Sequence, residues 1–403
     1  MSEPQRTNAA AEKDGWPHVA LAEVVTQRRD AVKVSDGQEY RLLGVRWWGE
    51  GAFHRETVTR ETSKATTFYK VEPGQFIYNR LFAGKGSFGT VIPDFEGAYV
   101  SNEFPLFDTD TERLGVDYLN LYFQQRSVWD YVEAVSTGTT KSRNRWKEGQ
   151  FLAHRIPLPP LPAQERIVRI VEVIDAQVSA LGAEADALDA LLRGRKEELF
   201  AHYAATEAPL PIGEVLEEVK RPIIVAPETE YWQIGIRSHG RGLFTKEAVT
   251  GASLGSKKVF WVEPGDLLIN IVFAWEGAVA IVPPEIEGYC GSHRFPAYRR
   301  LDGGDVEFFR LFFSTKSGTR LLASCSPGGA GRNRTLNRKR LMQSPVGMPS
   351  AQEQERAICE LQALEAPVVA VRAEADRLRA VRTALLSGLL DHSIALTAAE
   401  REV

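Results

Sequence analysis

Two identical triplets of basic and amide side chains are the residues of this sequence best suited to chemistry. They are Arg143-Asn144-Arg145 and Arg332-Asn333-Arg334, and each ends a stretch that contains glycine and serine. Guanidinium and side-chain amide groups can fork onto guanine and adenine edges, and cations on loops also bind backbone phosphates. The chemistry that these residues indicate is contact with nucleic acid.

Similar polar side chains recur in further segments that are typical of loops, and each segment occurs twice. Taken singly, any of these residues could equally be a solvated surface residue. Their repetition in two copies favours the set as a DNA interface. The predicted DNA-binding residues are Arg46, Trp48, Glu50, Asn79, Arg80, Lys85, Asn102, Lys141, Arg143, Asn144, Arg145, Arg237, His239, Arg241, Asn270, His293, Arg294, Arg332, Asn333 and Arg334.

The sequence lacks the residue patterns of an enzyme active site or a metal site. Its seven histidines show neither H-x-x-x-H nor H-E-x-x-H spacing. The segment 82–87 (FAGKGS) lacks the frame of a phosphate loop and predicts a plain β-turn. The acidic segment 93–96 (PDFE) predicts a turn between strands rather than part of a nuclease carboxylate set. We therefore expect no catalytic residue and no metal ligand in this chain.

Composition places the chain among ordinary globular proteins. Of its 403 residues, 43% are hydrophobic and 25% are charged, which excludes disorder as the main state. No stretch approaches ~18 consecutive apolar residues, so no membrane span is expected. The N-terminal segment lacks the apolar core of a secretion signal. Scattered cysteines at 290, 325 and 359 predict buried thiols in a reducing cytosol, and a cytoplasmic protein is expected.

The net charge of −4 is unevenly distributed along the chain. Residues 209–345 carry 18 Lys and Arg against 14 Asp and Glu, whereas residues 163–206 carry 5 against 8. Charge by domain matters more for DNA binding than the charge of the whole chain. The acidic total therefore does not exclude a DNA-binding protein.

An internal repeat organises the sequence. Residues 44–107 align with residues 235–298 without a gap, and 23 of the 64 positions are identical. The V-E-P-G turn at 71–74 recurs at 262–265. Because self-similarity at a fixed offset indicates a duplicated structural unit, the chain is interpreted as two copies of one domain.

Each copy predicts a domain of strands and short helices followed by one long helix. Short β-rich runs such as 76–82 and 267–273 alternate with Gly and Pro turns, and 118–135 and 306–322 look helical, so the fold class is α+β. Apolar residues then recur at alternating spacings of four and three, which is a heptad stripe. The stripes comprise Ile167, Val171, Ile174, Val178, Leu181, Ala185, Leu188 and Leu192, and Leu361, Leu364, Val368, Val371, Ala375, Leu378, Leu385 and Leu389, with Arg382 interrupting the second.

The two stripes are expected to pair as an antiparallel coiled coil that separates two homologous mixed-sheet domains. Each stripe is too narrow to be buried without a partner helix of similar length. The simplest interpretation is a structural coiled coil, and the functional one is a rigid spacer between the domains. Ser350 and Glu353 predict a capping box at the second helix start. The expected organisation is a tail (1–15), a recognition domain (16–158), a spacer helix (159–206), a second recognition domain (207–348), a second spacer helix (349–392) and a tail (393–403).

The repeated domain, the proline-bearing lead-in and the heptad helix resemble the specificity (S) subunit of type I restriction–modification systems. The resemblance covers residues 16–392. It rests on the V-E-P-G-[QD]-[FL]-[IL] turn, the basic glycine-containing run and the segment 156–176 (IPLPPLPAQERIVRIVEVIDA). The corresponding segment of the second copy, 344–364, is a weaker match.

The resemblance implies two target recognition domains, each binding one half of a bipartite site in double-stranded DNA. The helices would set the gap and dock two methyltransferase subunits, and restriction subunits would join through the complex. No catalytic residue is implied in this chain, and S-adenosylmethionine and ATP would belong to partner subunits. A nuclease or methyltransferase with unrecognised motifs and a protein-binding scaffold are the alternatives. The missing motifs argue against the enzyme, and the repeated Arg-Asn-Arg run argues against the scaffold.

Positions that are identical in both copies cannot distinguish two different half-sites. We therefore expect Arg46 and Arg237, Asn79 and Asn270, and the Arg-Asn-Arg triplets to hold the backbone or the fold. Positions that differ within the same loops are the candidates for base readout. They are Trp48 and Glu50 against His239 and Arg241, Arg80 against Ile271, and Asn102 and Glu103 against His293 and Arg294.

Overall fold

The computed structural model describes residues 15–138, 144–329 and 334–396. The chain divides into two compact units. Unit 1 comprises Met1–Leu181 and Ala373–Val403, and unit 2 comprises Gly182–Arg372. Among the described residues, no helix has both the length and the apolar character that a membrane crossing requires.

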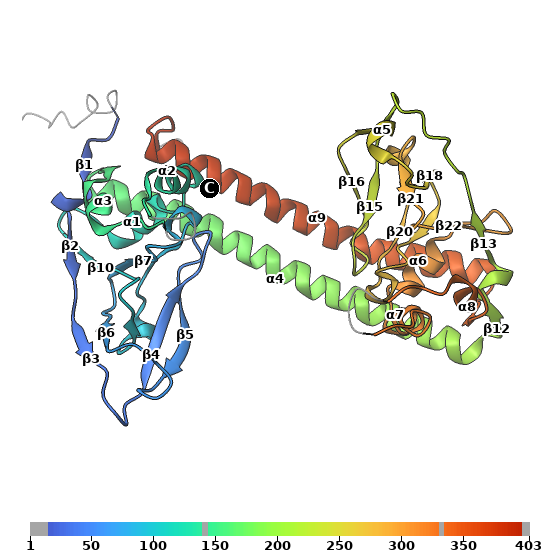
Figure 1. Cartoon of the computed structure of the whole chain (residues 1–403), viewed down its shortest axis with the longest axis horizontal. Coiled ribbons are helices and arrows are strands. Elements are labelled where there is room, and N and C mark those ends of the chain that lie inside the picture. Colours follow the sequence, from blue (N-terminus) through green and yellow to red (C-terminus); the bar gives the residue numbers. More distant parts are fainter. Residues whose placement is uncertain (1–14, 139–143, 330–333, 397–403) are drawn as a thin grey trace, which may run out of the picture. The chain divides into compact units, whose positions relative to one another are not determined.

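Unit 1 combines strands and short helices with one end of each of two long helices, α4 (Leu161–Thr206) and α9 (Ala351–Leu390) (Figure 1). Its larger sheets have the strand orders β2-β10-β7-β8 and β3-β6-β9-β4-β5, and the second is mixed because β4 and β9 run parallel. Its other elements are β1 (His18–Ala20), β2 (Val25–Arg28), β3 (Ala31–Lys33), β4 (Tyr40–Val45), β5 (Ala52–Val58), β6 (Thr67–Lys70), β7 (Phe76–Tyr78), β8 (Phe88–Thr90), β9 (Tyr99–Val100), β10 (Leu106–Thr109), α1 (Val116–Tyr122), α2 (Arg126–Val135), α3 (Glu148–Ala153) and β11 (Arg155–Pro157).

Unit 2 repeats this plan with shorter strand pairs. The sheet β13-β22-β19-β20 corresponds in order to β2-β10-β7-β8, and the remaining strands form the pairs β14-β17, β15-β16, β18-β21 and β12-β23. The α+β class and the repeat are confirmed. Its elements are β12 (Pro209–Pro211), β13 (Leu216–Val219), β14 (Glu230–Tyr231), β15 (Ile234–Ile236), β16 (Leu243–Thr245), β17 (Val249–Thr250), α5 (Gly251–Leu254), β18 (Val259–Trp261), β19 (Leu267–Ile269), β20 (Val279–Ile281), β21 (Cys290–Ser292), β22 (Ala297–Arg300), α6 (Glu307–Phe313), α7 (Lys316–Ser324), α8 (Arg338–Met342) and β23 (Pro345–Gly347).

Within the shared V-E-P-G-[QD] segment, residues 72–75 and 263–266 have the sequence of a type II turn, with Pro at the second position of the turn. That turn needs a positive φ at its third position, which glycine adopts without strain. Gly74 and Gly265 hold φ values of 86° and 85° there. The side chain that follows, Gln75 or Asp266, accepts a hydrogen bond of 2.9 Å from the turn's glutamate amide. The shared residues therefore fix the start of β7 and of β19 in the same way.

The long helices α4 and α9 pack in opposite directions within each unit. In unit 1, Ile167 and Ile174 near the start of α4 share a core with Leu389 near the end of α9. In unit 2, Leu199 near the end of α4 shares a core with Leu361 near the start of α9. All members of both predicted stripes are buried or half-buried. The antiparallel pairing predicted from the heptads is confirmed.

Arg382, which interrupts the second stripe, lies at a polar junction of unit 1. Its guanidinium binds the Asp175 carboxylate of α4, with an Nη2–Oδ2 distance of 2.9 Å. It also donates to the side-chain oxygen of Gln124, between α1 and α2, at 2.5 Å. Arg382, which breaks the apolar pattern, therefore links α9 to α4 and to the segment between α1 and α2. The predicted capping box is also present, because the Ser350 amide donates to the Glu353 carboxylate at 3.0 Å and the Ser350 hydroxyl oxygen accepts from the Glu353 amide at 3.4 Å.

One buried glutamine attaches each long helix to its domain. Gln164 is 1% exposed; its side chain accepts from the Gly115 amide at 2.9 Å and donates to the Pro159 carbonyl at 2.8 Å. In the second copy Gln354 donates to the Pro349 carbonyl at 2.8 Å and accepts from Arg300 at 2.6 Å. The glutamine of the repeated Gln-Glu-Arg motif is therefore a structural residue.

We predict that Gln164→Leu lowers the free energy of unfolding by about 1–3 kcal/mol, because it leaves the half-buried Gly115 amide without an acceptor. Gln177→Leu, at an exposed position of the same helix, is the matched control and is expected to change stability by less than about 0.5 kcal/mol. Urea unfolding measures both. Equal effects of the two substitutions would show that the bonds of Gln164 contribute nothing to stability.

A half-buried histidine is expected to make the stability of unit 1 sensitive to acid. The His154 ring accepts or donates a 2.8 Å hydrogen bond with the Tyr122 hydroxyl, and burial lowers its pKa from 6.5 to about 4. The unfolded chain therefore binds a proton at higher pH than the folded chain does, and stability falls as pH drops from about 6.5 towards 4.

We predict that unit 1 loses up to about 3 kcal/mol of stability over this pH range and that His154→Gln removes this loss. His54→Gln, at an exposed histidine of the same unit, is the control. Thermal unfolding at pH 7 and pH 4.5 measures the difference. A loss of the same size in wild type and His154→Gln would assign the acid sensitivity to other groups.

The structure corrects several local expectations. The stretches 118–135 and 306–322 each form two helices, because Gln125 and Thr315 are extended, and the Thr315 hydroxyl caps α7 by accepting from the Gly318 amide. The segment 82–87 contains a short 3₁₀ helix, Ala83–Lys85, rather than a plain β-turn. Cys290 and Cys325 are buried as expected, whereas Cys359 is exposed on α9.

Candidate nucleic-acid interface

The first predicted loop has the same backbone frame in both copies. The amide of Arg46 donates to the Gly51 carbonyl at 2.9 Å, and the amide of Arg237 donates to Gly242 at 3.0 Å. Each arginine also covers an aromatic ring of the following strand: Arg46 lies 4.7 Å from the Phe53 ring centre and Arg237 lies 5.1 Å from that of Phe244. These contacts agree with the structural role expected for the shared arginines.

At the tip of this loop, Trp48 and His239 occupy equivalent positions with a left-handed backbone. Their φ values are 62° and 61°, which is unfavourable for any residue with a side chain and rare for a bulky one. The amide of Trp48 donates to the Lys85 carbonyl, and that of His239 to the Glu276 carbonyl, both at 2.8 Å. The neighbouring 3₁₀ turn therefore holds the strained residue in place and leaves its side chain exposed. Strain of this kind is concentrated at functional sites.

Aromatic rings and cations gather beside Trp48 in unit 1. Trp48 is 53% exposed and Trp47 is 39% exposed. The Lys85 ammonium lies 4.3 Å from the Trp47 ring centre, and the Arg126 guanidinium lies 5.8 Å from that of Trp48. The sequence places Trp47 in the predicted loop but does not indicate Arg126. The doubled tryptophan is a signal for the first, and no local pattern indicates the second.

The second predicted loop begins at a shared asparagine. The Asn79 side-chain oxygen accepts from the Leu81 amide at 3.0 Å, and that of Asn270 accepts from the Val272 amide at 3.1 Å. Both side chains are buried, at 9% and 6% exposure. These asparagines end β7 and β19 by turning the chain, which supports a structural role and explains why the β-rich runs stop early.

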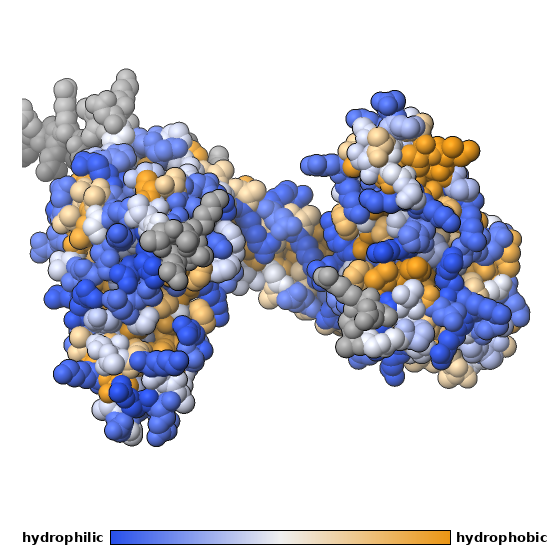
Figure 2. All heavy atoms as spheres, viewed as in Figure 1, coloured by the Kyte–Doolittle hydropathy of each residue, from blue (hydrophilic) through white to orange (hydrophobic). Residues whose placement is uncertain are grey.

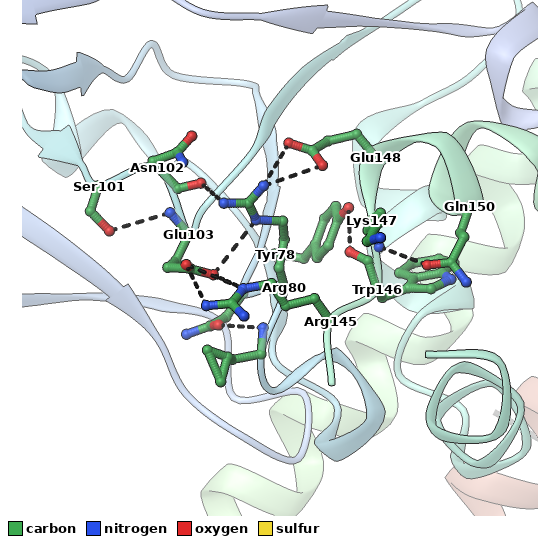
Figure 3. Close-up of polar contacts among 12 residues, drawn as sticks. Tyr78, Arg80, Ser101, Asn102, Glu103, Arg145, Trp146, Lys147, Glu148 and Gln150 are labelled. Atoms are coloured by element: carbon green, nitrogen blue, oxygen red, sulfur yellow. Dashed lines mark hydrogen bonds and ion pairs between the residues drawn. The ribbon is translucent and has the colours of Figure 1, made fainter. Parts of the chain in front are cut away.

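Arg80 lies within an ion-pair network, the acidic cradle, that also contains Glu103, Arg145 and Glu148 (Figure 3). The guanidinium of Arg80 donates to Glu148 at 3.1 Å and to the Asn102 carbonyl at 2.6 Å. Arg145 donates to Glu103 at 2.9 Å through Nη2 and at 3.0 Å through Nε, and this pairing raises the arginine's pKa. The Arg80 side chain is only 13% exposed. These contacts favour a structural role for Arg80 over the predicted base contact.

The equivalent region of unit 2 has a different set of side chains. Ile271 replaces Arg80 and Arg294 replaces Glu103. Arg334, which ends the second triplet, lies with its guanidinium 5.2 Å from the Trp275 ring centre. Unit 2 therefore lacks the carboxylates of the acidic cradle at these positions and presents Arg294 exposed instead.

The remaining predicted residues are placed as follows. Glu50, Arg241 and His293 are exposed, and Asn144 is half-buried. Asn102 is exposed, and its side-chain oxygen accepts from Arg29 at 2.9 Å. The predicted residues Lys141, Arg143, Arg332 and Asn333 lie outside the described residues.

Hydrophilic side chains cover most of the visible face of each unit, with apolar side chains in smaller patches between them (Figure 2). Within the described residues, no group of three or more His, Cys, Asp or Glu side chains could hold a metal ion. The geometry on each unit is thus a surface of loops with exposed planar and charged side chains. Such a surface can contact base edges and phosphates.

Comparisons with known proteins agree with this geometry. Residues 13–187 match the model of the family described as the type I restriction modification DNA specificity domain. Comparison with curated proteins gives no significant match.

Two solved structures share the fold. One is a chain from a structure described as the basis of complex assembly and conformational transition of the type I R-M system. It is 18% identical, the match covers 94% of this chain and 99% of that chain, and the TM-score is 0.61. The other is the type I restriction-modification system S subunit from M. genitalium, at 13% identity, 95% and 98% coverage and a TM-score of 0.54. The resemblance predicted from the sequence is therefore confirmed: residues 13–187 match the type I restriction modification DNA specificity domain, and the chain is similar in fold to these two solved structures.

Proposed function

We propose that this chain is the non-catalytic specificity subunit of a type I restriction–modification complex. Each unit binds one half of an asymmetric, bipartite target in double-stranded DNA. The paired helices α4 and α9 set the gap between the half-sites and dock two methyltransferase subunits. Restriction subunits join through that complex, and S-adenosylmethionine and ATP are bound by the partners.

One observation carries this proposal: the same strained loop frame displays Trp48 in one unit and His239 in the other. The backbone contacts of the frame are repeated, with equal φ values and equal hydrogen bonds to the adjoining 3₁₀ turn. The side chains that the frame presents differ in shape, charge and hydrogen-bonding groups. Two copies of one frame with different displayed groups are suited to reading two different short sequences.

The acidic cradle adds a second difference between the units. Glu103 pairs with Arg145 in unit 1, whereas unit 2 has Arg294 at the equivalent position. An exposed arginine can fork onto guanine O6 and N7, and a glutamate can accept from cytosine N4. Different half-sites, and hence an asymmetric target, follow from this difference.

The test is to purify the chain with its genomic neighbours and to select bound duplexes from a randomised library. We expect methyltransferase subunits to co-purify and the selected DNA to contain two unlike half-sites at a fixed gap. The isolated chain is expected to bind DNA without turnover of DNA, ATP or S-adenosylmethionine. A palindromic target, or turnover by the contaminant-free chain, would contradict the proposal and support the enzyme alternative. Binding of proteins but not DNA would support the scaffold alternative.

A further inference from the structure

The two units differ in one equivalent region, which is filled by side chains in unit 1 and contains a cavity in unit 2. In unit 2 a cavity of about 300 Å³ lies between β13, β18 and the loop before β22. At the equivalent strands and loop of unit 1 the free space is only about 10 Å³. Lining positions such as Phe260, His293 and Phe295 correspond to Tyr69, Asn102 and Phe104 at the repeat offset.

In unit 1 two arginines fill this space. Arg80 reaches across to Glu148 at 3.1 Å and to the Asn102 carbonyl at 2.6 Å. Arg29 donates to the Tyr69 hydroxyl at 3.1 Å and to the Asn102 side chain at 2.9 Å. Because each arginine is anchored at two points, the region is closed by polar contacts.

In unit 2 the groups that would close the space are missing. Ile271 stands in place of Arg80, and Arg338 occupies the first turn of α8 as Glu148 does in α3. Arg338 turns to Glu218, with an Nη1–Oε1 distance of 2.6 Å. A short apolar side chain and a diverted arginine therefore leave the cavity open.

We propose that this cavity binds one nucleotide, with the base inside and the phosphate at its rim. Its lining includes the residues Phe260, Trp261, Phe295 and Ile271. Aromatic and apolar walls of this kind hold an unstacked base, and about 300 Å³ is at the small end of ligand sites. Trp261 is 40% exposed, so its ring is accessible from solvent.

Charge at the rim favours a phosphate. Lys220 and His293 line the cavity and are exposed, and Arg338 lies beside them. Glu218 is the one carboxylate in the lining, and it is already paired with Arg338 at 2.6 Å and with Lys220 at 3.5 Å. Because the Glu218 carboxylate only partly neutralises Lys220 and Arg338, a phosphate can also bind to these cations.

The cavity adjoins the predicted DNA surface, because His293 is one of the predicted DNA-binding residues and also belongs to the lining. This inference rests on the proposed function for the source of the nucleotide: a base turned out of the duplex at the second half-site. The same chemistry would also accept a free nucleotide. The two sources are separated by the experiment.

The experiment uses the full chain. In the first arm, 2-aminopurine replaces each base of the second half-site in turn, and its fluorescence is measured as the duplex binds. We expect a several-fold rise at one position, because the base leaves the stack. In the second arm, each of the four deoxynucleoside monophosphates is titrated while the fluorescence of the tryptophans is followed, with Trp261→Phe identifying the responding ring.

The principal variant rebuilds the closed arrangement of unit 1 with the double substitution Ile271→Arg and Arg338→Glu. It is expected to lose the signals in both arms. Lys220→Ala is a second variant at an exposed position, and is expected to weaken nucleotide binding about tenfold. Lys316→Ala, at a lysine of unit 2 that does not line this cavity, is its control and is expected to match the wild type.

The outcomes separate this inference from the proposed function. A rise in the first arm that the double variant removes establishes an extruded base, and saturable quenching in the second arm alone establishes a free-nucleotide site. Duplex binding with no signal in either arm overturns the cavity's role and leaves the proposed function intact. No duplex binding at all contradicts the proposed function, and the second arm then decides about the cavity by itself.

Discussion

One heptad inserted into both α4 and α9 at the boundary between the units is expected to lengthen the gap between the half-sites by about three base pairs. The insertions follow Leu181 in α4 and Arg372 in α9, where the chain passes from one unit to the other. Seven residues add ~10 Å to a helix at ~1.5 Å per residue. At ~3.4 Å per base pair this is about three pairs. The half-site sequences should not change, because the loops that present side chains to DNA are untouched.

The insertion must be made in both helices and must be a whole heptad. Ion pairs link the helices at fixed places in each unit, Arg382 to Asp175 in unit 1 and Arg195 to Glu360 in unit 2. Seven residues preserve the alternating three–four spacing of the stripes, whereas a length that is not a multiple of seven would interrupt it and rotate the apolar faces relative to each other.

Methylation mapping with the assembled complex measures the gap. A heptad inserted into α4 alone is the control, and it is expected to lower thermal stability because the stripes no longer match. Changed half-site bases at an unchanged gap would refute the role of the helices as a spacer.

The features that sequence reasoning predicted correctly are those with a periodic or repeated signal. The heptad stripes predicted paired helices because the apolar stripe of each helix is buried only when it packs against the stripe of the other. The V-E-P-G turn and the Ser350 capping box depend on residues within four positions, so their conformations follow from local chemistry. The repeat aligns Asn79 with Asn270, and both residues turn the chain in the same way.

The features that sequence reasoning missed depend on contacts between distant residues. Arg80 was selected as a base reader because it differs from Ile271, but Glu148, 68 positions along the chain, holds it in the acidic cradle. The break at Gln125 and Thr315 was missed because the apolar pattern continues through it. The left-handed backbone of Trp48 was also missed. It requires the carbonyl of Lys85 as an acceptor, and nothing near Trp48 in the sequence indicates that contact.

Exchanging the loop side chains between the units is expected to exchange their base preferences. The unit 1 variant carries Trp48→His and Glu50→Arg, and the unit 2 variant carries His239→Trp and Arg241→Glu. Each fork-like contact with a base discriminates by about 1–3 kcal/mol, so the preference at the affected positions should change by roughly 5- to 150-fold. Selection from a randomised duplex library, scored separately for each half-site, measures this change.

The equal backbone of the two loops is the reason to expect a clean exchange. Trp48 and His239 already share a φ near 60°, so each frame is suited to the other's side chain without a new backbone conformation. Arg46→Ala is the contrasting control, because it removes a residue that covers Phe53 and is shared by both copies. It should weaken binding to all sequences alike. A uniform loss of affinity in the exchanged variants, with unchanged preferences, would show that the loops hold the domain and do not read bases.

Trp48→Gly separates strain from recognition at this position. Glycine adopts the left-handed conformation freely, so the substitution relieves about 1 kcal/mol or more of strain while it removes the ring. It also removes the contacts of Trp48 with Trp129 and Arg126, which offset that gain. We therefore expect the free energy of unfolding to change by less than about 1 kcal/mol while discrimination at the first half-site is lost. Unchanged stability with lost discrimination would show that the strained Trp48 ring serves binding and not folding. Retained discrimination in this variant would show that the ring is not needed for base readout.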